Sequence, residues 1–283
     1  MVIKMKAMEV EQLIQGTLIR DGGGVKLRRY IGADKTNHFE PILLFDYFDS
    51  SDPLDYLAGF PPHPHRGFET ITYLMEGSIT HEDNKGNKGV INAGGVQWMT
   101  AGKGIIHSEM PSSSTDRLHG LQLWLNLPAA EKWREPRYQE KSSDQLPIEV
   151  MESGATIKVI AGRIDQGLSS PIVEIATRPL FLDITLPANA TIQQTIPDDY
   201  QAVLFVIEGT VNTGGQQITA GTLASLTNGE RIQIEGKDKE NRNHCLLIAA
   251  AKLHEPIVRY GPFVMNTQEE IMQAIHDFRT GHF

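Results

Sequence analysis

Two short stretches of the sequence carry side chains that could bind one metal ion together. A single residue separates His63 from His65, and a single residue separates His107 from Glu109. In an extended strand, residues i and i+2 point to the same face, so each stretch presents two side chains on one side. If the two strands lie side by side, antiparallel, three imidazoles and one carboxylate surround one point. The predicted ligands are His63, His65, His107 and Glu109.

This ligand set suits a first-row divalent transition metal. Imidazole nitrogen and carboxylate oxygen bind such ions at about 2.0–2.2 Å, and positions remain open for water, dioxygen or a substrate. One His-x-His pair alone is also typical of surface histidines. The second pair, which follows the turn at Gly102 and Gly104, favours the metal site.

Glu69 is the main alternative to Glu109 as the acidic ligand. It follows His65 by four residues, so an unbroken strand would place both side chains on one face. A bend at Gly67 would separate them. In that case the expected role of Glu69 is a salt bridge or a hydrogen bond to a ligand histidine.

The elements that must position these residues are mostly β-strands. Hydrophobic residues alternate in residues 121–127 (LQLWLNL), with the four leucines on one face. Gly 26 and Pro 15 among 283 residues favour many turns and short strands, which predicts an antiparallel sandwich or barrel. Residues 73–79 (YLMEGSI) are echoed by residues 205–211 (FVIEGTV), so the chain is expected to hold two similar β domains.

We predict domain limits from the end of the alternating pattern. Pro128 ends the last strand of the first half, and charged and polar residues follow it. The prediction is an N-terminal metal-binding domain over residues 1–130, a linker over 131–146, and a second domain over 147–283 without metal ligands. From Thr267 to Phe278 the hydrophobic spacing predicts a helix, with Thr267 as its N-cap.

Composition excludes several classes of protein. The formal net charge of −9 and a pI near 5.6 argue against a nucleic-acid binder, which needs a cationic surface. Cys245 is the single cysteine, so no intrachain disulfide or thiolate cluster can form, as suits a reducing compartment. No stretch approaches the ~20 apolar residues of a membrane span. A cytoplasmic protein without membrane contact is expected.

Four motifs resemble the pirin family of bicupins. They are residues 62–70 (PHPHRGFET), 97–111 (QWMTAGKGIIHSEMP), 121–128 (LQLWLNLP) and 260–267 (YGPFVMNT). The resemblance implies two jelly-roll cupin barrels with a short C-terminal helix, and a metal in the N-terminal barrel only. It implies His63, His65, His107 and Glu109 as ligands, which favours Glu109 over Glu69. Fe(II) is the expected metal, with Ni, Co, Cu, Zn and Mn as alternatives.

The second half of the chain agrees with this asymmetry. We expect the equivalents of the ligand stretches around residues 202–209 and 224–227, and neither contains a histidine. His244 and His254 lack the paired spacing, and His81 is expected to make local hydrogen bonds.

The resemblance further implies a dioxygenase that cleaves quercetin or a related flavonol with O2 and releases CO. Glu109 would act as the base that removes the substrate's proton if it is released from the metal or only weakly held by it. The pocket mouth is expected at Phe60, Pro61, Pro62, Met99 and Met110, whereas Trp98 and Trp124 are expected to be core residues. The alternative is a metal- or redox-sensing protein that regulates a transcription factor or a metabolic enzyme.

Overall fold

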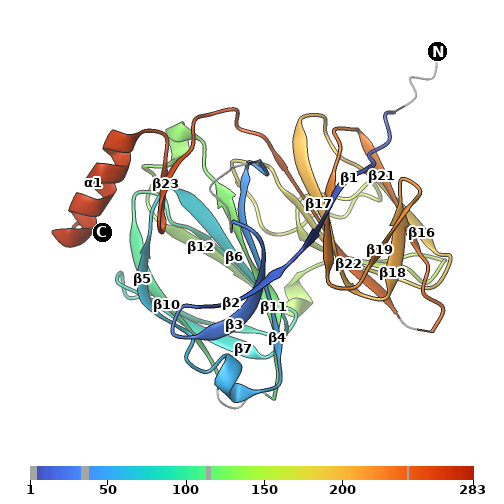
Figure 1. The fold of residues 1–283 in the computed structure, drawn as a ribbon, viewed down its shortest axis with the longest axis horizontal. Helices are drawn as coiled ribbons and strands as arrows, with labels where there is room; N and C mark the ends of the chain where they lie inside the picture. Colours follow the sequence, from blue (N-terminus) through green and yellow to red (C-terminus); the bar gives the residue numbers. More distant parts are fainter. Residues whose placement is uncertain (1–4, 33–37, 113–115, 241) are drawn as a thin grey trace. The chain divides into compact units, whose positions relative to one another are not determined.

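A computed structural model describes residues 5–32, 38–112, 116–240 and 242–283, and the chain divides into two compact β units. The first β unit comprises Thr17–Ser143 and Leu253–Phe283. The second comprises the chain up to Gly16 and Asp144–Lys252. Figure 1 traces their strands along the sequence.

Two antiparallel sheets form the first β unit. The larger sheet has the order β12 (Arg137–Lys141), β9 (Val96–Thr100), β6 (Phe68–Glu76), β11 (Leu118–Asn126), β4 (Ile42–Ser50), β3 (Val25–Ile31), β2 (Thr17–Asp21). The smaller sheet has the order β5 (Phe60–His65), β10 (Ile105–Pro111), β7 (Ser78–Asp83), β8 (Lys88–Asn92). Short 3-10 helices occupy Pro53–Asp55, Ala129–Glu131 and Ser143–Gln145.

The two sheets of the first β unit pack face to face. Phe48 and Leu74 of the larger sheet share one buried hydrophobic cluster with Ile79 and Ile91 of the smaller sheet. Because side chains alternate between the faces of a strand, the polar residues at even spacing from these apolar positions also form a set that points inward. This inward polar set is where the predicted metal ligands lie.

The second β unit repeats this strand order. Its larger sheet runs β1 (Val10–Gln15), β20 (Thr222–Leu226), β17 (Tyr200–Glu208), β22 (Asn243–Ala251), β15 (Leu180–Leu186), β14 (Thr156–Ala161), β13 (Ile148–Val150). Its smaller sheet runs β16 (Thr191–Thr195), β21 (Arg231–Gly236), β18 (Thr210–Thr213), β19 (Gln216–Thr219). The predicted duplication is therefore confirmed as a repeated topology of two open, facing sheets.

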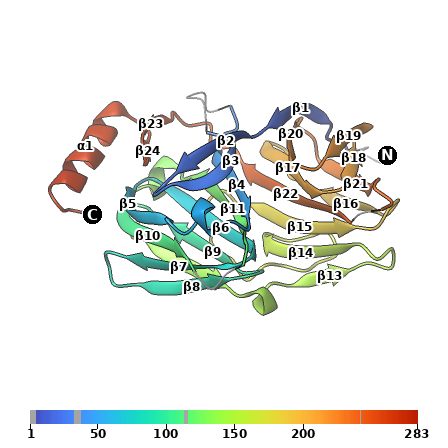
Figure 2. The same cartoon turned by 60° about the horizontal axis from the view of Figure 1, so that its bottom comes forward.

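The compact units differ from the predicted domain limits at both ends of the chain. β1 pairs antiparallel with β20 and so completes the larger sheet of the second β unit, as Figure 2 shows. In the first β unit the corresponding edge, next to β9, is taken by β12. The chain after Lys252 returns to the first unit. Sequence patterns describe each strand's own faces and carry no information on which sheet edge it joins.

The C-terminal segment forms a hairpin and a helix on the first β unit. It contains β23 (Val258–Tyr260), β24 (Phe263–Met265) and α1 (Gln268–Arg279). The predicted helix is confirmed, with Thr267 and Glu270 forming a capping box. Among the described residues, no helix is long and apolar enough to cross a membrane.

Contacts with the turn between β5 and β6 fix this segment. The amide nitrogen of Arg66 donates to the Pro262 carbonyl at 3.3 Å, and that of Val264 donates to the Arg66 carbonyl at 3.0 Å. The buried Arg66 guanidinium forms an ion pair with Asp277 of α1 at 2.7 Å. A charge buried this deeply is costly unless it is paired, so Asp277 helps to hold α1 in place.

Lys132 stabilises the same turn through hydrogen bonds from its side chain. Its side chain is fully buried, and Nζ donates to the carbonyls of Gly67 (2.7 Å) and Val264 (2.9 Å) and to Oδ1 of Asn126 (2.7 Å). Burial lowers the pKa of Lys132 to about 7, an effect that the charges of Glu255 and Glu270 only partly offset.

The buried amine predicts a pH dependence of stability. Between about pH 7 and the unfolded-state pKa near 10.4, the unfolded chain holds a proton that the folded chain has lost. The free energy of unfolding should therefore rise with pH across this window, by up to ~1.4 kcal/mol per pH unit, and Lys132 should contribute no slope well below pH 7. Urea unfolding of the wild type and of Lys132→Met at several pH values measures the difference. Parallel pH profiles for the two proteins would contradict this prediction.

Candidate metal centre

Three of the four predicted ligands converge between β5 and β10. The two strands are antiparallel, with His63 directly opposite His107 and His65 opposite Ile105. The ligating atoms of His63, His65 and His107 all lie within 4.8 Å of one another. Ring centroids are 4.6 Å apart for His63 and His65, 4.5 Å for His63 and His107, and 5.0 Å for His65 and His107.

The imidazoles of this cluster are suited to a metal ion. His65 Nδ1 and both ring nitrogens of His107 are buried without a hydrogen-bond partner. Burial, with the nearby imidazoles as a second cause, lowers the pKa of both His65 and His107 well below the usual value. The rings are therefore neutral at pH 7 and keep a lone pair for a cation. A first-row metal ion would satisfy one nitrogen of each ring.

His63 is oriented by the strand that carries it. Its Nδ1 lies 2.8 Å from the Pro61 carbonyl oxygen, which can only accept, so Nδ1 carries the proton. Nε2 is then the nitrogen with the free lone pair. A ligand histidine typically has its second ring nitrogen held in this way.

Glu109 follows His107 by two residues on β10 and is held by hydrogen bonds from the larger sheet. Its carboxylate is buried, Oε1 accepts from Thr72 Oγ1 at 2.9 Å, and Oε2 accepts from Gln122 Nε2 at 2.7 Å. The Glu109 carboxylate does not belong to the group of ligand atoms that lie within 4.8 Å of one another. A shift in register between His107 and Glu109 marks a bulge that changes the direction of the strand. Its role as the fourth ligand stays a prediction.

Glu69 lies on the other face of β6. Gly67 adopts φ +88°, which ends β5 and starts β6 afresh, and a Cβ there would collide with the Val264 carbonyl. Thr72 points to Glu109, so Glu69, at odd spacing from Thr72, points away from the cluster. Its Oε1 accepts from Thr100 Oγ1 at 2.7 Å, and burial raises the pKa of Glu69. The chain therefore bends at Gly67, which separates Glu69 from His65.

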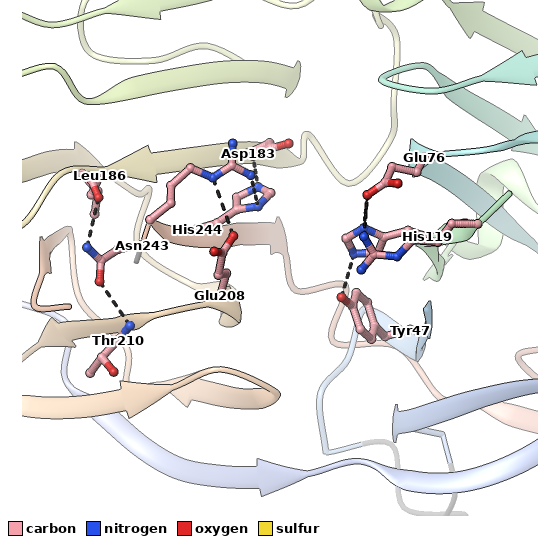
Figure 3. A network of polar contacts seen from close by, with 11 residues as sticks. Tyr47, Glu76, His119, Asp183, Leu186, Glu208, Thr210, Asn243 and His244 are labelled. Atoms are coloured by element: carbon pink, nitrogen blue, oxygen red, sulfur yellow. Dashed lines mark hydrogen bonds and ion pairs between the residues drawn. The ribbon is translucent and has the colours of Figure 1, made fainter. Parts of the chain in front are cut away.

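Other buried histidines have different surroundings. His81 is not in the cluster. Its ring lies 4.5 Å from that of Tyr138 in a tilted arrangement, and its Nδ1 has no hydrogen-bond partner among the described residues, so the expected local hydrogen bonding is not made by Nδ1. Figure 3 shows His119 against Tyr47 and His244 against Asp183. The distances are 2.7 Å from His119 Nε2 to the Tyr47 hydroxyl and 2.6 Å from His244 Nε2 to Asp183 Oδ1.

A pocket of about 500 Å³ opens onto the imidazole cluster. His63, His65 and Gln122 form part of its wall, so the residue that holds Glu109 also faces the pocket. This volume is within the range of small-molecule sites. The arrangement can bring a small molecule to the imidazoles and to Gln122, whose amide donates to Glu109.

The walls of the pocket agree only in part with the sequence-based prediction. Phe60, Pro61 and Pro62 line it as expected. Met99 is buried in a separate cluster and Met110 is exposed, and neither is part of the wall. Trp98 is a core residue.

Trp124 is a wall residue, against expectation, because it has the parity of Gln122 and so points inward. The sequence analysis also missed Arg29, Asp46 and Arg259, which line the same pocket. No local pattern marks them, since they come from β3, β4 and β23.

The second β unit has no comparable cluster among the described residues. β16 and β21 occupy the same places in the smaller sheet of the second β unit as β5 and β10 do in the first, so they are their counterparts. There the inward pairs are Ile192 opposite Ile234 and Gln194 opposite Ile232, all buried in the core of the unit. The expected equivalents at residues 202–209 and 224–227 are wrong, because those residues lie on β17 and β20, the counterparts of β6 and β9.

Comparison with known proteins gives a consistent result. A family model described as Pirin matches residues 24–125, and one described as Pirin C-terminal cupin domain matches residues 181–283. A pirin-like protein of Caulobacter vibrioides is 43% identical, covering 99% of this chain and 100% of its own. Human pirin is 45% identical, covering 92% of this chain and 88% of its own. A crystal structure of quercetin 2,3-dioxygenase from Acinetobacter baumannii superposes with a TM-score of 0.89 at 31% identity and covers 98% of both chains.

The site predicts how metal affinity responds to the loss of one imidazole. His107→Ala removes the imidazole that β10 contributes, and we expect the affinity for Ni(II) or Co(II) to fall on the order of 100-fold or more. Metal analysis of the purified protein and titration calorimetry measure this. His276→Ala, which changes an exposed histidine of α1, is the matched control and should retain wild-type affinity. One tightly bound ion per chain in His107→Ala would refute the assignment.

Proposed function

The chain belongs to the pirin family, and on that premise we propose that it is a metal-dependent dioxygenase that cleaves quercetin or a related flavonol. The observation that carries the proposal is the cluster of three imidazoles, two of which line a pocket, together with the buried carboxylate of Glu109 two residues after His107 on β10. The similarity to quercetin 2,3-dioxygenase of Acinetobacter baumannii supports the choice of substrate. We further propose that the protein acts in the cytoplasm.

His63, His65 and His107 would hold the metal, and Glu109 is the proposed fourth ligand. Fe(II) is the metal we propose, because nitrogen and carboxylate donors with open positions suit it, although nickel, cobalt, copper, zinc and manganese also fit imidazole donors. When bound, the metal supplies a Lewis acid that lowers the pKa of a coordinated hydroxyl group.

Glu109 is the proposed general base. In its carboxylate form, each oxygen accepts one hydrogen bond, from Thr72 or from Gln122, and keeps a further lone pair for the proton of a flavonol hydroxyl. The two donors fix the orientation of the carboxylate, which reduces the reorganisation needed for proton transfer. Gln122 reaches both the carboxylate and the pocket, so it can also contact the substrate.

The pocket wall suits a flat aromatic molecule. Phe60, Pro61, Pro62 and Trp124 present apolar surface next to His63 and His65. Such a wall excludes water from the reacting atoms and aligns the substrate by its ring faces. In the proposed reaction, one flavonol and one O2 give one ring-opened ester and one CO. The bonds on either side of carbon 3 break, and both atoms of O2 enter the ester product.

The wild-type protein should consume oxygen in the presence of quercetin. We expect an equimolar release of CO and a rate above that of the same concentration of free metal, in at least one of the Fe(II), Ni(II) and Co(II) forms. An oxygen electrode together with gas analysis of CO measures both quantities. His63→Ala should lose metal and turnover together.

Failure of all three metal forms to exceed free metal would overturn the dioxygenase proposal. In that case the metal- or redox-sensing regulator becomes the better account. The set of proteins captured by the oxidised and reduced forms would then have to differ.

The role of Glu109 predicts a separate effect on rate. Glu109→Gln keeps the size of the side chain and removes the base, so we expect kcat to fall on the order of 100-fold. Because three imidazoles remain, the variant should keep most of its metal. Glu82→Gln changes an exposed carboxylate on β7 and serves as the matched control. An unaltered kcat in Glu109→Gln would rule out the base role.

A further inference from the structure

Two arginines line the pocket, and they differ in what neutralises them. Arg29 donates Nε and Nη2 to the Asp46 carboxylate at 2.8 and 2.7 Å, and Nη2 also reaches Asp21 at 2.6 Å. Within the described part of the chain, Arg259 donates to two backbone carbonyls, from Nη1 to Leu43 at 3.2 Å and from Nε to Gly261 at 3.5 Å. Among the described residues, no carboxylate forms an ion pair with it. Its guanidinium retains unused N–H groups.

The surroundings stabilise one cation and destabilise the other. Burial acts against the charge of Arg29, but the hydrogen bonds and charge of Asp46 outweigh burial and raise the pKa of Arg29. Burial, followed by the charge of Arg29, lowers the pKa of Arg259, and Asp46 offsets this only in part. Arginine still stays protonated in proteins. The cation of Arg259 would therefore gain from an additional negative group.

Trp124 links Arg259 to the imidazole cluster. The guanidinium carbon lies 5.0 Å from the centroid of the Trp124 ring, and the same ring meets His65 edge-on at 5.2 Å. All three side chains belong to the wall of one pocket. An aromatic molecule with one end at the cluster can lie along Trp124 and reach Arg259 with its other end.

We propose that Arg259 binds an anionic oxygen group, a carboxylate or an ionised phenol, at the far end of a planar aromatic substrate. The identity of the metal-binding end rests on the proposed function, whereas recognition of the charge at Arg259 requires no turnover. A guanidinium matches the two oxygens of a carboxylate with two parallel hydrogen bonds. Asp21 and Asp46 do not block this group, because both are occupied by Arg29. Arg259 thus sets substrate specificity from β23, outside the strands that carry the metal ligands.

A matched pair of ligands tests the assignment without catalysis. The probes are 3-hydroxyflavone and its 4′-carboxylate, titrated by calorimetry into the protein as purified, under nitrogen. We expect the wild type to bind the carboxylate about tenfold more tightly or better, in line with a charge-assisted hydrogen bond. Arg259→Gln should reduce this preference to less than about twofold and leave the affinity for the uncharged probe within about twofold of wild type.

Two further variants control for charge and for structure. Arg259→Lys keeps the charge and loses the paired donors, so its preference should lie between those of the wild type and of Arg259→Gln. Arg279→Gln makes the same change of charge at an exposed position of α1 and should keep the wild-type preference. Metal content and the thermal midpoint verify that each variant is folded.

The proposal is overturned if the wild type shows no preference, or if Arg259→Gln keeps it. If Arg259→Gln does not fold, Arg259→Lys decides, and an unchanged preference in that variant overturns the proposal. Preference that depends on Arg259 without oxygen uptake would refute the dioxygenase and leave the anion site standing. Oxygen uptake without this preference would support the dioxygenase and refute the anion site at Arg259.

Discussion

Burial of the imidazoles is the constraint on which the rest of the site depends. His65 and His107 are 2% and 1% exposed, and a protonated ring in that position would lack solvation. Burial therefore keeps the lone pairs available at neutral pH, but it leaves ring nitrogens without hydrogen bonds. Such unsatisfied groups are costly in a folded protein. The unpartnered nitrogens of His65 and His107 belong to rings that face one another across β5 and β10, and this clustering favours a role in binding a ligand.

The duplicated unit shows what the same scaffold does without that constraint. At the positions equivalent to His63 and His107, the second β unit has Ile192 and Ile234, which pack into one continuous hydrophobic cluster. Gln194 replaces His65 and hydrogen-bonds to Asp165 and to a backbone carbonyl. The fold thus supports either a packed interior or a polar one at the same strand pair. The side chains on two strands, not the topology, decide whether a site exists.

The alternation of side chains within a single strand could be predicted from the sequence, whereas arrangements between strands could not. The i, i+2 spacing correctly brought His63 and His65 to one face, and the alternation in residues 121–127 correctly predicted a buried strand. The direction of Glu69 depends on the backbone at Gly67. The positive φ of Gly67 changes which residues of β6 point inward, compared with an unbroken strand. The exchange of chain ends between the units depends on which sheet edge is open. Gly67 is a local signal that allows a bend without requiring one, whereas the exchange of chain ends has no local signal in the sequence.

The C-terminal segment connects these observations. It returns to the first β unit, where the Val264 carbonyl lies so close to Gly67 that no side chain fits at that position. Lys132 donates hydrogen bonds to the backbone carbonyls of both residues. The turn that directs His65 inward is therefore held by residues nearly 200 positions away in the sequence. The same segment contributes Arg259 and Pro262 to the pocket wall. Metal ligation and ligand selection are thus assigned to separate parts of the chain, so the pocket end at β23 can vary in charge while the imidazoles on β5 and β10 stay in place.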